Sequence, residues 1–304
     1  MKAVVFAYHT MGVLGIKKLL AHGFEIPLVF THEDSPDENI WFGSVSDLCR
    51  EKGIGHAAPE NPGTDEWIGR VASLKPDIVF SFYYRRMISG EILRIPPLGA
   101  YNLHGSLLPA YRGRAPVNWV LVRGEQTTGV TLHEMVEKPD AGAIVAQEEV
   151  AIGPDDTAVV LFGRLEEAAS RMLDAILPRI RRGDITRTPQ DLQRGSYFGG
   201  RKPEDGHISW DRSAREVFNL IRGVTRPYPG AFGFLGGRKV LIWWARPLEG
   251  PSPGPGSVAV SKGLVFIGTA SGAIMPLEIE VDGTVYKGEE VAEYFKTHEG
   301  KRMT

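Results

Sequence analysis

Short, continuous apolar runs alternate along the first half of the chain with segments in which apolar residues recur every three or four positions. The continuous runs predict strands that are buried on both faces, and the helical spacing predicts amphipathic helices between them. Strands separated by helices are joined by right-handed crossovers, so the predicted fold class is α/β, with a doubly wound, mostly parallel, Rossmann-like sheet. The predicted strands are Lys2–Tyr8, Glu25–His32, Asp77–Tyr84, Ala100–Gly105 and Thr128–Val136.

The pattern changes in the second half of the chain. A long helix is predicted from Asp156 to Gly183, and S-A-R-E at Ser213 is a capping-box signal that begins a shorter helix. After Gly230, short apolar runs are separated by glycine and proline turns, which is typical of a small antiparallel barrel. We therefore predict a first domain at 1–190, a linker at 191–205 and a second, barrel domain at 206–304.

Charge and composition exclude several classes of protein. The 304 residues include 35 Lys and Arg against 37 Asp and Glu, a net charge of −2, which argues against a protein that mainly coats nucleic acid or an anionic membrane. The uncharged stretch Ala3–Ile16 is too short to span a bilayer, and no small-residue cleavage site follows Met1–Gly23, so neither membrane insertion nor a signal peptide is expected. The single cysteine, Cys49, has no internal disulfide partner and fits a cytoplasmic location.

The first predicted strand leads into HTMGVLGI, the place where a dinucleotide-binding fold carries its glycine-rich fingerprint. Gly12 and Gly15 form GxxG and not GxGxxG, and the sequence contains no GxxxxGK(S/T) phosphate loop. A nicotinamide enzyme and a nucleotide-hydrolysing enzyme are therefore disfavoured. We expect Gly12 and Gly15 to permit a tight turn from the first strand into the first helix.

Polar side chains with catalytic chemistry lie at the ends of two predicted strands. Asn102 and His104 are two residues apart on one strand and therefore point to the same face, and Asp140 lies in a turn between two strands. Because ligands of open α/β sheets bind beyond the carboxyl ends of the strands, we expect these groups to converge. An amide, an imidazole and a carboxylate suit acyl transfer to an amine, in which the oxyanion needs hydrogen-bond donors and the amine loses a proton.

A carboxylate beside His104 is expected to raise the pKa of the imidazole and favour its charged form. Residue types alone also fit a structural interpretation, in which Asn102 and His104 are satisfied polar residues at a strand end. No GxSxG nucleophile elbow accompanies the histidine, so a covalent acyl-enzyme is not expected. Packing is the simpler interpretation of His9, His32 and His133, and because no pair of histidines has metal-ligand spacing, no metal centre is expected.

The segment NLHGSLLPAYRG, which begins at Asn102, resembles the signature of the folate-dependent formyltransferases: N-x-H, S-L-L-P, a following R-G and a downstream D-A-G. This resemblance implies that Asn102, His104 and Asp140 are the catalytic residues. It also implies that the formyl donor is 10-formyltetrahydrofolate and that the acceptor is a primary amine. The second domain of that family is a small barrel of the oligonucleotide-binding (OB) kind, in agreement with the barrel predicted above.

From Met1 to about Asp156 the sequence resembles the formyltransferase half of the bifunctional polymyxin-resistance enzymes, on the segments FAYHTMGVLGI, FSFYYR and YRGRAPVNWVLVRGE. The similarity implies transfer to the 4-amino group of UDP-4-amino-4-deoxy-L-arabinose (UDP-L-Ara4N), for lipid A modification. The decarboxylase half has no counterpart here, so we expect either a separate partner decarboxylase or an excised half of a larger enzyme. The implied cofactor contacts are Arg86, Met87, Ile88, Arg114, Val136, Glu137, Lys138 and Pro139, and the candidate acceptor contacts are Tyr111, Arg112 and Trp119.

Methionyl-tRNA formyltransferases are the main alternative, because they share the catalytic residues and the barrel. Their A-A-P-I motif is R-A-P-V here, and the loop Glu33–Gly43, which would face the acceptor stem, carries acidic residues and no Lys or Arg. The stretch Arg179–Lys202 holds seven Lys or Arg and two acids, which suits a solvated face, a phosphate track or the neighbourhood of a diphosphate. The acidic loop and the low net charge favour a sugar nucleotide over tRNA.

Overall fold

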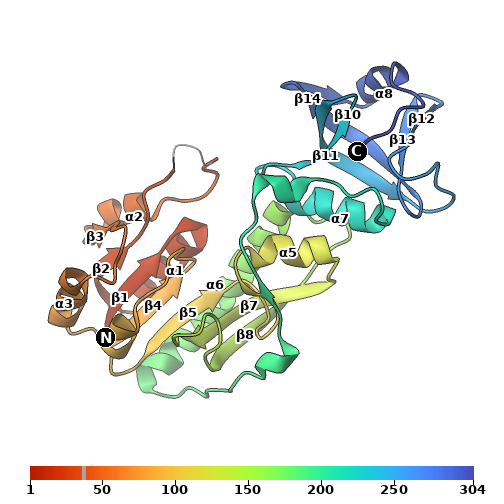
Figure 1. The fold of residues 1–304 in the computed structure, drawn as a ribbon. Helices are drawn as coiled ribbons and strands as arrows, with labels where there is room; N and C mark the ends of the chain where they lie inside the picture. The colour runs from red at the N-terminus through yellow and green to blue at the C-terminus, as the bar shows by residue number, and fades with distance from the viewer. Residues whose placement is uncertain (36–38) are drawn as a thin grey trace. The chain divides into compact units, whose positions relative to one another are not determined.

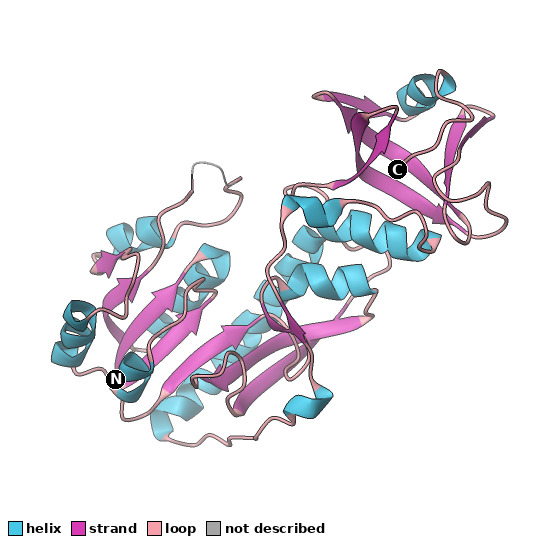
Figure 2. Ribbon diagram, in the orientation of Figure 1, coloured by secondary structure: helices cyan, strands magenta, loops and turns pink. Residues whose placement is uncertain are grey.

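The continuous apolar runs form the inner strands of a seven-stranded sheet, and helices cover both faces of those strands (Figures 1 and 2). This computed structural model describes residues 1–35 and 39–304. In the order β3-β2-β1-β4-β5-β7-β8, the first five strands are parallel, and β7 and β8 are antiparallel to their neighbours. The predicted doubly wound, mostly parallel sheet is confirmed. The strands are β1 (Lys2–Ala7), β2 (Glu25–Phe30), β3 (His56–Ala57), β4 (Ile78–Phe82), β5 (Ala100–His104), β7 (Thr127–Glu134) and β8 (Ile144–Ala151).

Alternate residues of each strand point to opposite faces of this sheet, and different helices cover the two faces. On one face Phe6 joins a buried cluster with Val71 of α3 and Ile92 of α4. On the other face α1 lies against Ala7 and Phe82. Within residues 1–35 and 39–304, no helix has both the length and the apolar character needed to cross a membrane. The helices are α1 (His9–Ala21), α2 (Val45–Lys52), α3 (Asp65–Leu74), α4 (Gly90–Arg94) and α6 (Ala158–Arg182).

Helix α1 begins at His9, directly after β1, so Gly12 and Gly15 lie inside the helix. Their predicted role in the strand-to-helix turn is therefore wrong. The two glycines instead let the helix approach the sheet closely: a Cβ at Gly15 would lie 2.4 Å from Phe82 Cγ, and a Cβ at Gly12 would lie 3.1 Å from Ala7 Cβ. His9 makes the turn, with a φ of +67° in the left-handed region.

The chain forms two structural units, each made of segments that are separated in sequence. The second unit contains most of α5 (Pro116–Arg123) and all of α7 (Ala214–Val224), which begins with the capping box predicted at Ser213. The first unit comprises Met1–Pro116, Thr127–Ala151 and Phe162–Phe198, and the second comprises Val117–Gln126, Ile152–Leu161 and Gly199–Thr304.

The short apolar runs after Gly230 form an antiparallel sheet, which confirms the antiparallel second region. The end of the chain bridges its two outer strands: Met303 pairs with Leu235 of β10, and the Val258 N–H of β12 donates to the Lys301 carbonyl at 3.1 Å. Helix α8 (Glu289–Lys296) adds an element beyond those predicted. The strands, in the order β10-β11-β14-β13-β12 with β15 beside β14, are β10 (Ala231–Leu235), β11 (Arg238–Leu248), β12 (Val258–Ser261), β13 (Leu264–Gly268), β14 (Ala273–Val281) and β15 (Thr284–Lys287).

Gly15→Ala is expected to destabilise the first unit, because the new methyl group would overlap the Phe82 ring. Overpacking of this kind lowers the free energy of unfolding by about 1–3 kcal/mol, which urea denaturation measures. Gly69→Ala in α3 is the matched control, since among the described residues a Cβ built there meets nothing within 4 Å beyond its chain neighbours and its own helix backbone. Equal unfolding free energies for the two variants would contradict the close approach of α1 to the sheet.

Candidate active site

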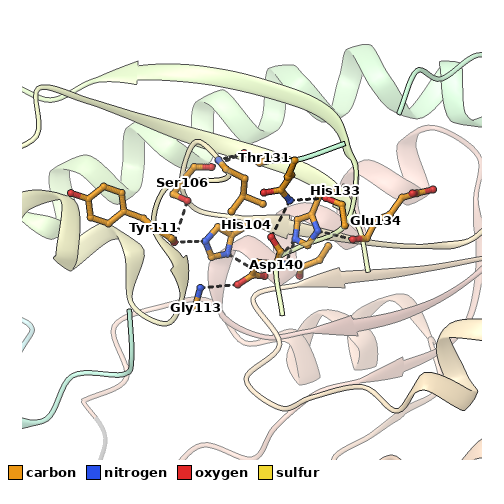
Figure 3. A network of polar contacts seen from close by, with 12 residues as sticks. His104, Ser106, Tyr111, Gly113, Thr131, His133, Glu134 and Asp140 are labelled. Atoms are coloured by element: carbon orange, nitrogen blue, oxygen red, sulfur yellow. Dashed lines mark hydrogen bonds and ion pairs between the residues drawn. The ribbon is translucent and has the colours of Figure 1, made fainter. Parts of the chain in front are cut away.

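The carboxyl end of β5 carries Asn102 and His104, the two residues whose spacing predicts that they share a face. Strand β7 pairs antiparallel with β5 and brings His133 opposite Asn102. The turn after β7 brings Asp140 beside His104 and His133 (Figure 3). Asn102 binds His133, so the four residues form one polar network. The structure thus brings together the three residues predicted to be catalytic and adds His133 to them.

His104 is buried, with 6% of its surface exposed, and its ring has partners on two sides. Its Nε2–H donates to the Tyr111 carbonyl at 2.8 Å. Because a carbonyl oxygen only accepts, the proton of the neutral ring lies on Nε2 and the lone pair lies on Nδ1. Nδ1 is 3.7 Å from Asp140 Oδ1, so the nitrogen that can take up a proton faces a carboxylate.

Asp140 is held in one orientation in the turn between β7 and β8. Its φ of +51° is left-handed, a conformation that costs a non-glycine residue on the order of 1–3 kcal/mol and persists only where surrounding contacts impose it. The Gly113 N–H donates to Oδ2 at 2.8 Å, while Oδ1 lies 3.5 Å from His133 Nε2. The carboxylate therefore lies between two imidazoles and a backbone amide.

His133 has a larger part in the site than the packing role expected for it. Its Nδ1–H donates to the Glu134 carbonyl at 2.7 Å, which leaves Nε2 as the acceptor of an Asn102 Nδ2–H at 3.2 Å. The signal that identifies His133 is the antiparallel register of β5 and β7, in which Asn102 faces His133. That register cannot be read from the two strands separately, because each shows only its own alternation.

Burial governs the protonation of the network. Removal from water lowers the pKa of His104 by more than Asp140 and the Tyr111 carbonyl raise it. Asp140 does act to raise the pKa of His104, as expected, but a net increase is not found, because desolvation of the buried ring is the larger effect. Burial acts to raise the pKa of Asp140, but His104, His133 and the Gly113 amide outweigh it and hold that pKa well below its usual range. Near neutral pH the pair is a carboxylate beside a neutral imidazole.

A cavity of about 350 Å³ contains two of the predicted cofactor contacts, Arg86 and Arg114, and a third arginine, Arg85. Arg114 Nη2 donates to the Arg85 carbonyl at 3.3 Å. Gly113, whose N–H binds Asp140, is the chain neighbour of Arg114, which lines the cavity. The cavity is lined by His32, Glu33, Ser35, Ala58, Glu60, Arg85, Arg86 and Arg114.

The remaining predicted cofactor contacts lie on the loop after β4 and on the turn after β7. Ile88 is buried in the cluster that Met135 packs against, whereas Met87 and Val136 expose 62% and 45% of their surfaces. Glu137 pairs with Arg94 of α4 at 3.5 Å, which brings the turn beside α4, the helix that follows this loop. These two segments supply Met87, Ile88, Val136, Glu137, Lys138 and Pro139.

The three candidate acceptor contacts have different surroundings. The Tyr111 ring stacks on Phe198 with centroids 5.0 Å apart, and Arg112 is buried. Trp119 belongs to the second unit, where its Nε1–H donates to the Gly199 carbonyl at 3.0 Å and the Arg201 guanidinium lies over its ring. Tyr111 contacts His104 through its backbone carbonyl and not through its ring.

His9 and His32 have contacts within the protein that account for their positions. His9 packs among Trp41, Phe42 and Phe162, as a packing role predicts. His32 accepts the Arg85 N–H at 3.0 Å, and burial together with the nearby arginines lowers its pKa to about 4. In the described parts of the chain, no group of three or more His, Cys, Asp or Glu side chains is arranged to hold a metal ion. Residues 36–38 of the acidic loop at Glu33–Gly43 lie outside the described residues.

The fold and the site define an α/β enzyme of group transfer, with an amide, an imidazole and a carboxylate at the carboxyl end of an inner strand. The chain belongs to the formyl transferase family: the family model described as "Formyl transferase" matches residues 2–177. A second model, "Formyl transferase, C-terminal domain", matches residues 201–296. The protein is therefore a transferase.

Solved structures share this fold. An N-formyltransferase from Helicobacter canadensis, in complex with folinic acid and dTDP-3-aminofucose, has a TM-score of 0.71 and 20% identity over 91% of this chain and 98% of its own. A sugar N-formyltransferase from Shewanella sp. has a TM-score of 0.63 and 18% identity over 80% of this chain and 97% of its own. HypX from Aquifex aeolicus has a TM-score of 0.64 and 20% identity over 97% of this chain. This chain spans 48% of the HypX chain. At such identities the similarity establishes the fold alone.

The His104 ring is expected to remain neutral in the free protein as the pH falls from 8 through 6.5, the ordinary pKa of histidine, because burial lowers its pKa. Nitrogen-15 NMR of the imidazole measures this, with the proton expected on Nε2. His104→Gln assigns the resonance by removing it. A ring that is half protonated at or above pH 6.5 would contradict the dominance of burial over the Asp140 charge.

Proposed function

We propose that this protein transfers a formyl group from 10-formyltetrahydrofolate to a primary amine of a nucleotide-linked sugar, with Asn102, His104 and Asp140 as catalytic residues. The observation that carries the proposal is the lone-pair nitrogen of His104 beside the Asp140 carboxylate, 3.7 Å away. An amine that attacks a formyl carbon must lose a proton, and a neutral imidazole is the side chain best suited to accept it near neutral pH.

The residues around the cavity fit a folate. Its glutamate end is anionic, and Arg85, Arg86 and Arg114 outnumber the two glutamates of the lining. The exposed side chains of Met87 and Val136 offer apolar surface to a flat ring system. When bound, 10-formyltetrahydrofolate supplies the activated formyl group. The Helicobacter canadensis enzyme was solved with folinic acid, and HypX was solved with tetrahydrofolic acid, which supports a folate in this fold.

In the proposed reaction the acceptor nitrogen forms a bond to the formyl carbon, and the bond from that carbon to N10 breaks. Asn102 Nδ2 has a second N–H besides the one bonded to His133, and it donates to the formyl oxygen as negative charge develops there. One such donor commonly contributes about 2.7–4 kcal/mol. His104 Nδ1 takes the proton of the attacking amine, and Asp140 stabilises the resulting imidazolium. The proton then passes to the leaving N10, which returns His104 to its neutral form.

The acceptor we propose is UDP-L-Ara4N, formylated on its 4-amino group. The sequence similarity to the polymyxin-resistance enzymes supports this sugar, and with it a role in lipid A modification and a partner decarboxylase on a separate chain. The Helicobacter canadensis enzyme was solved with a dTDP-amino sugar, which supports a nucleotide-linked amine in this fold.

The contacts of the basic stretch Arg179–Lys202 disfavour a tRNA acceptor. Several of its arginines have partners within the protein: Arg187 binds Glu134 and the Tyr101 hydroxyl, and Arg181 donates to the His22 carbonyl. Side chains held in this way offer less charge to a phosphate backbone than a row of solvated arginines would.

The acceptor is tested by incubating the protein with 10-formyltetrahydrofolate and, separately, UDP-L-Ara4N, a dTDP-amino sugar and methionyl-tRNA. Mass spectrometry of the product is expected to show formylation of UDP-L-Ara4N with the highest kcat/KM. Formylation of the tRNA alone would overturn the sugar acceptor, and formylation of none would overturn the function.

His104→Ala is expected to lower kcat for formyl transfer roughly 10²- to 10⁴-fold, because the proton acceptor is lost. The matched control is His56→Ala, which removes an exposed histidine of β3. Thermal unfolding should show both variants folded at the assay temperature, although His104→Ala loses some stability because the side chain is buried. A His104→Ala enzyme as active as the control would refute the proton-transfer role.

A further inference from the structure

Residues 188–198, which follow α6, run across both loops that contact His104. The segment begins as a short antiparallel bridge, in which Thr188 and Ile144 exchange two backbone hydrogen bonds of 2.8 Å. It ends as β9 (Tyr197–Phe198), which pairs with β6 (Arg112–Gly113). The 188–198 segment thus connects the start of β8, beyond the Asp140 turn, with the loop that contains Tyr111 and Gly113.

Gln190 holds the turn that carries Asp140. Its Nε2 donates to the Asp140 carbonyl at 3.0 Å and to the Gly142 carbonyl at 2.6 Å, so both protons of one amide are used on this turn. The turn includes the left-handed Asp140, whose conformation requires outside contacts. Gln190 therefore binds the backbone from which the Asp140 carboxylate projects.

The other end of the segment holds the second partner of His104. The Tyr111 N–H donates to Ser196 Oγ at 2.8 Å, and the Arg112 N–H donates to the Ser196 carbonyl at 3.0 Å. Gly113, whose N–H binds Asp140, packs so closely on Phe198 that a Cβ would lie 2.1 Å from the Phe198 oxygen. The Tyr111 carbonyl that accepts from His104 and the amide that binds Asp140 are therefore both set by this segment.

We propose that Gln190 is a positioning residue for formyl transfer, which acts through Asp140 to hold the carboxylate against His104. The 188–198 segment as a whole keeps the two sides of the His104 ring, the Tyr111 carbonyl and the Asp140 carboxylate, in register. This inference rests on the proposed catalytic role of Asp140. It assigns a structural role to residues 188–198, which lie within the basic stretch Arg179–Lys202.

The test compares Gln190→Met, which keeps the length of the side chain and removes its donors, with Gln193→Met. Gln193 is an exposed glutamine of the same segment. Gln190→Met is expected to lower kcat roughly 10- to 100-fold through displacement of the carboxylate, with KM for both substrates unchanged, while Gln193→Met behaves as the wild type. Should Gln190→Met fail to fold, Gln190→Asn is used instead, because its amide is one methylene shorter and no longer reaches the two carbonyls. Wild-type kcat in the folded Gln190 variant would overturn the proposal.

A double-mutant cycle separates positioning through Asp140 from a general structural role. In an Asp140→Asn background, Gln190→Met is expected to cause no further loss of kcat, because the group it positions is already gone. If the two substitutions lower kcat independently, so that their fold-changes multiply, the proposal that Gln190 acts through Asp140 is overturned.

Amide hydrogen exchange decides the proposal without a substrate. The Gly113 N–H has Asp140 as its acceptor, so its exchange should be faster in Gln190→Met than in Gln193→Met. An unchanged exchange rate at Gly113 would contradict the role of Gln190 even if UDP-L-Ara4N is the correct substrate. If the wild type formylates none of the amines tested, the proposed function fails, and the exchange experiment still tests the contact of Gln190 with the Asp140 turn.

Discussion

A buried carboxylate is the constraint on which the rest of the site depends. The Asp140 side chain is only 14% exposed, and its low pKa keeps it ionised, so it needs polar partners from the protein itself. The Gly113 amide supplies one donor, and two imidazoles lie within 3.7 Å. These groups come from three loops and strands that meet only in the folded protein. Once the carboxylate is fixed, an imidazolium formed on His104 has its counter-ion in place.

Burial and the Asp140 charge act on the protonation of His104 in opposite directions. Desolvation keeps the ring neutral at rest, so that it can accept a proton, and the carboxylate stabilises the charge once a proton arrives. In a polar, solvated site the carboxylate alone would favour a ring already protonated, which could not act as a base. The activity we propose therefore requires both the dry surroundings of β5 and the charge of Asp140.

The sequence predicts the parts of the site that depend on local periodicity. The inner strands follow from their continuous apolar runs, and the shared face of Asn102 and His104 follows from their spacing of two. His133 and Gln190 could not be predicted in this way, since their roles depend on the register of β5 with β7 and on the contact of Gln190 with Asp140, 50 positions away. The direction of the His104 pKa shift also depends on burial, which no pair of residue types reveals. The chain's near-neutral charge likewise conceals the three arginines that gather in one cavity.

The pH dependence of kcat in single turnovers, compared between the wild type and Asp140→Asn, tests the central claim most directly. The account predicts a lower plateau for the variant, because the imidazolium loses its counter-ion. It also predicts that the acidic limb moves to lower pH, since the loss of the carboxylate removes a charge that raises the pKa of His104 while burial continues to lower it. An acidic limb that stays in place or moves to higher pH would contradict the coupling of His104 to Asp140.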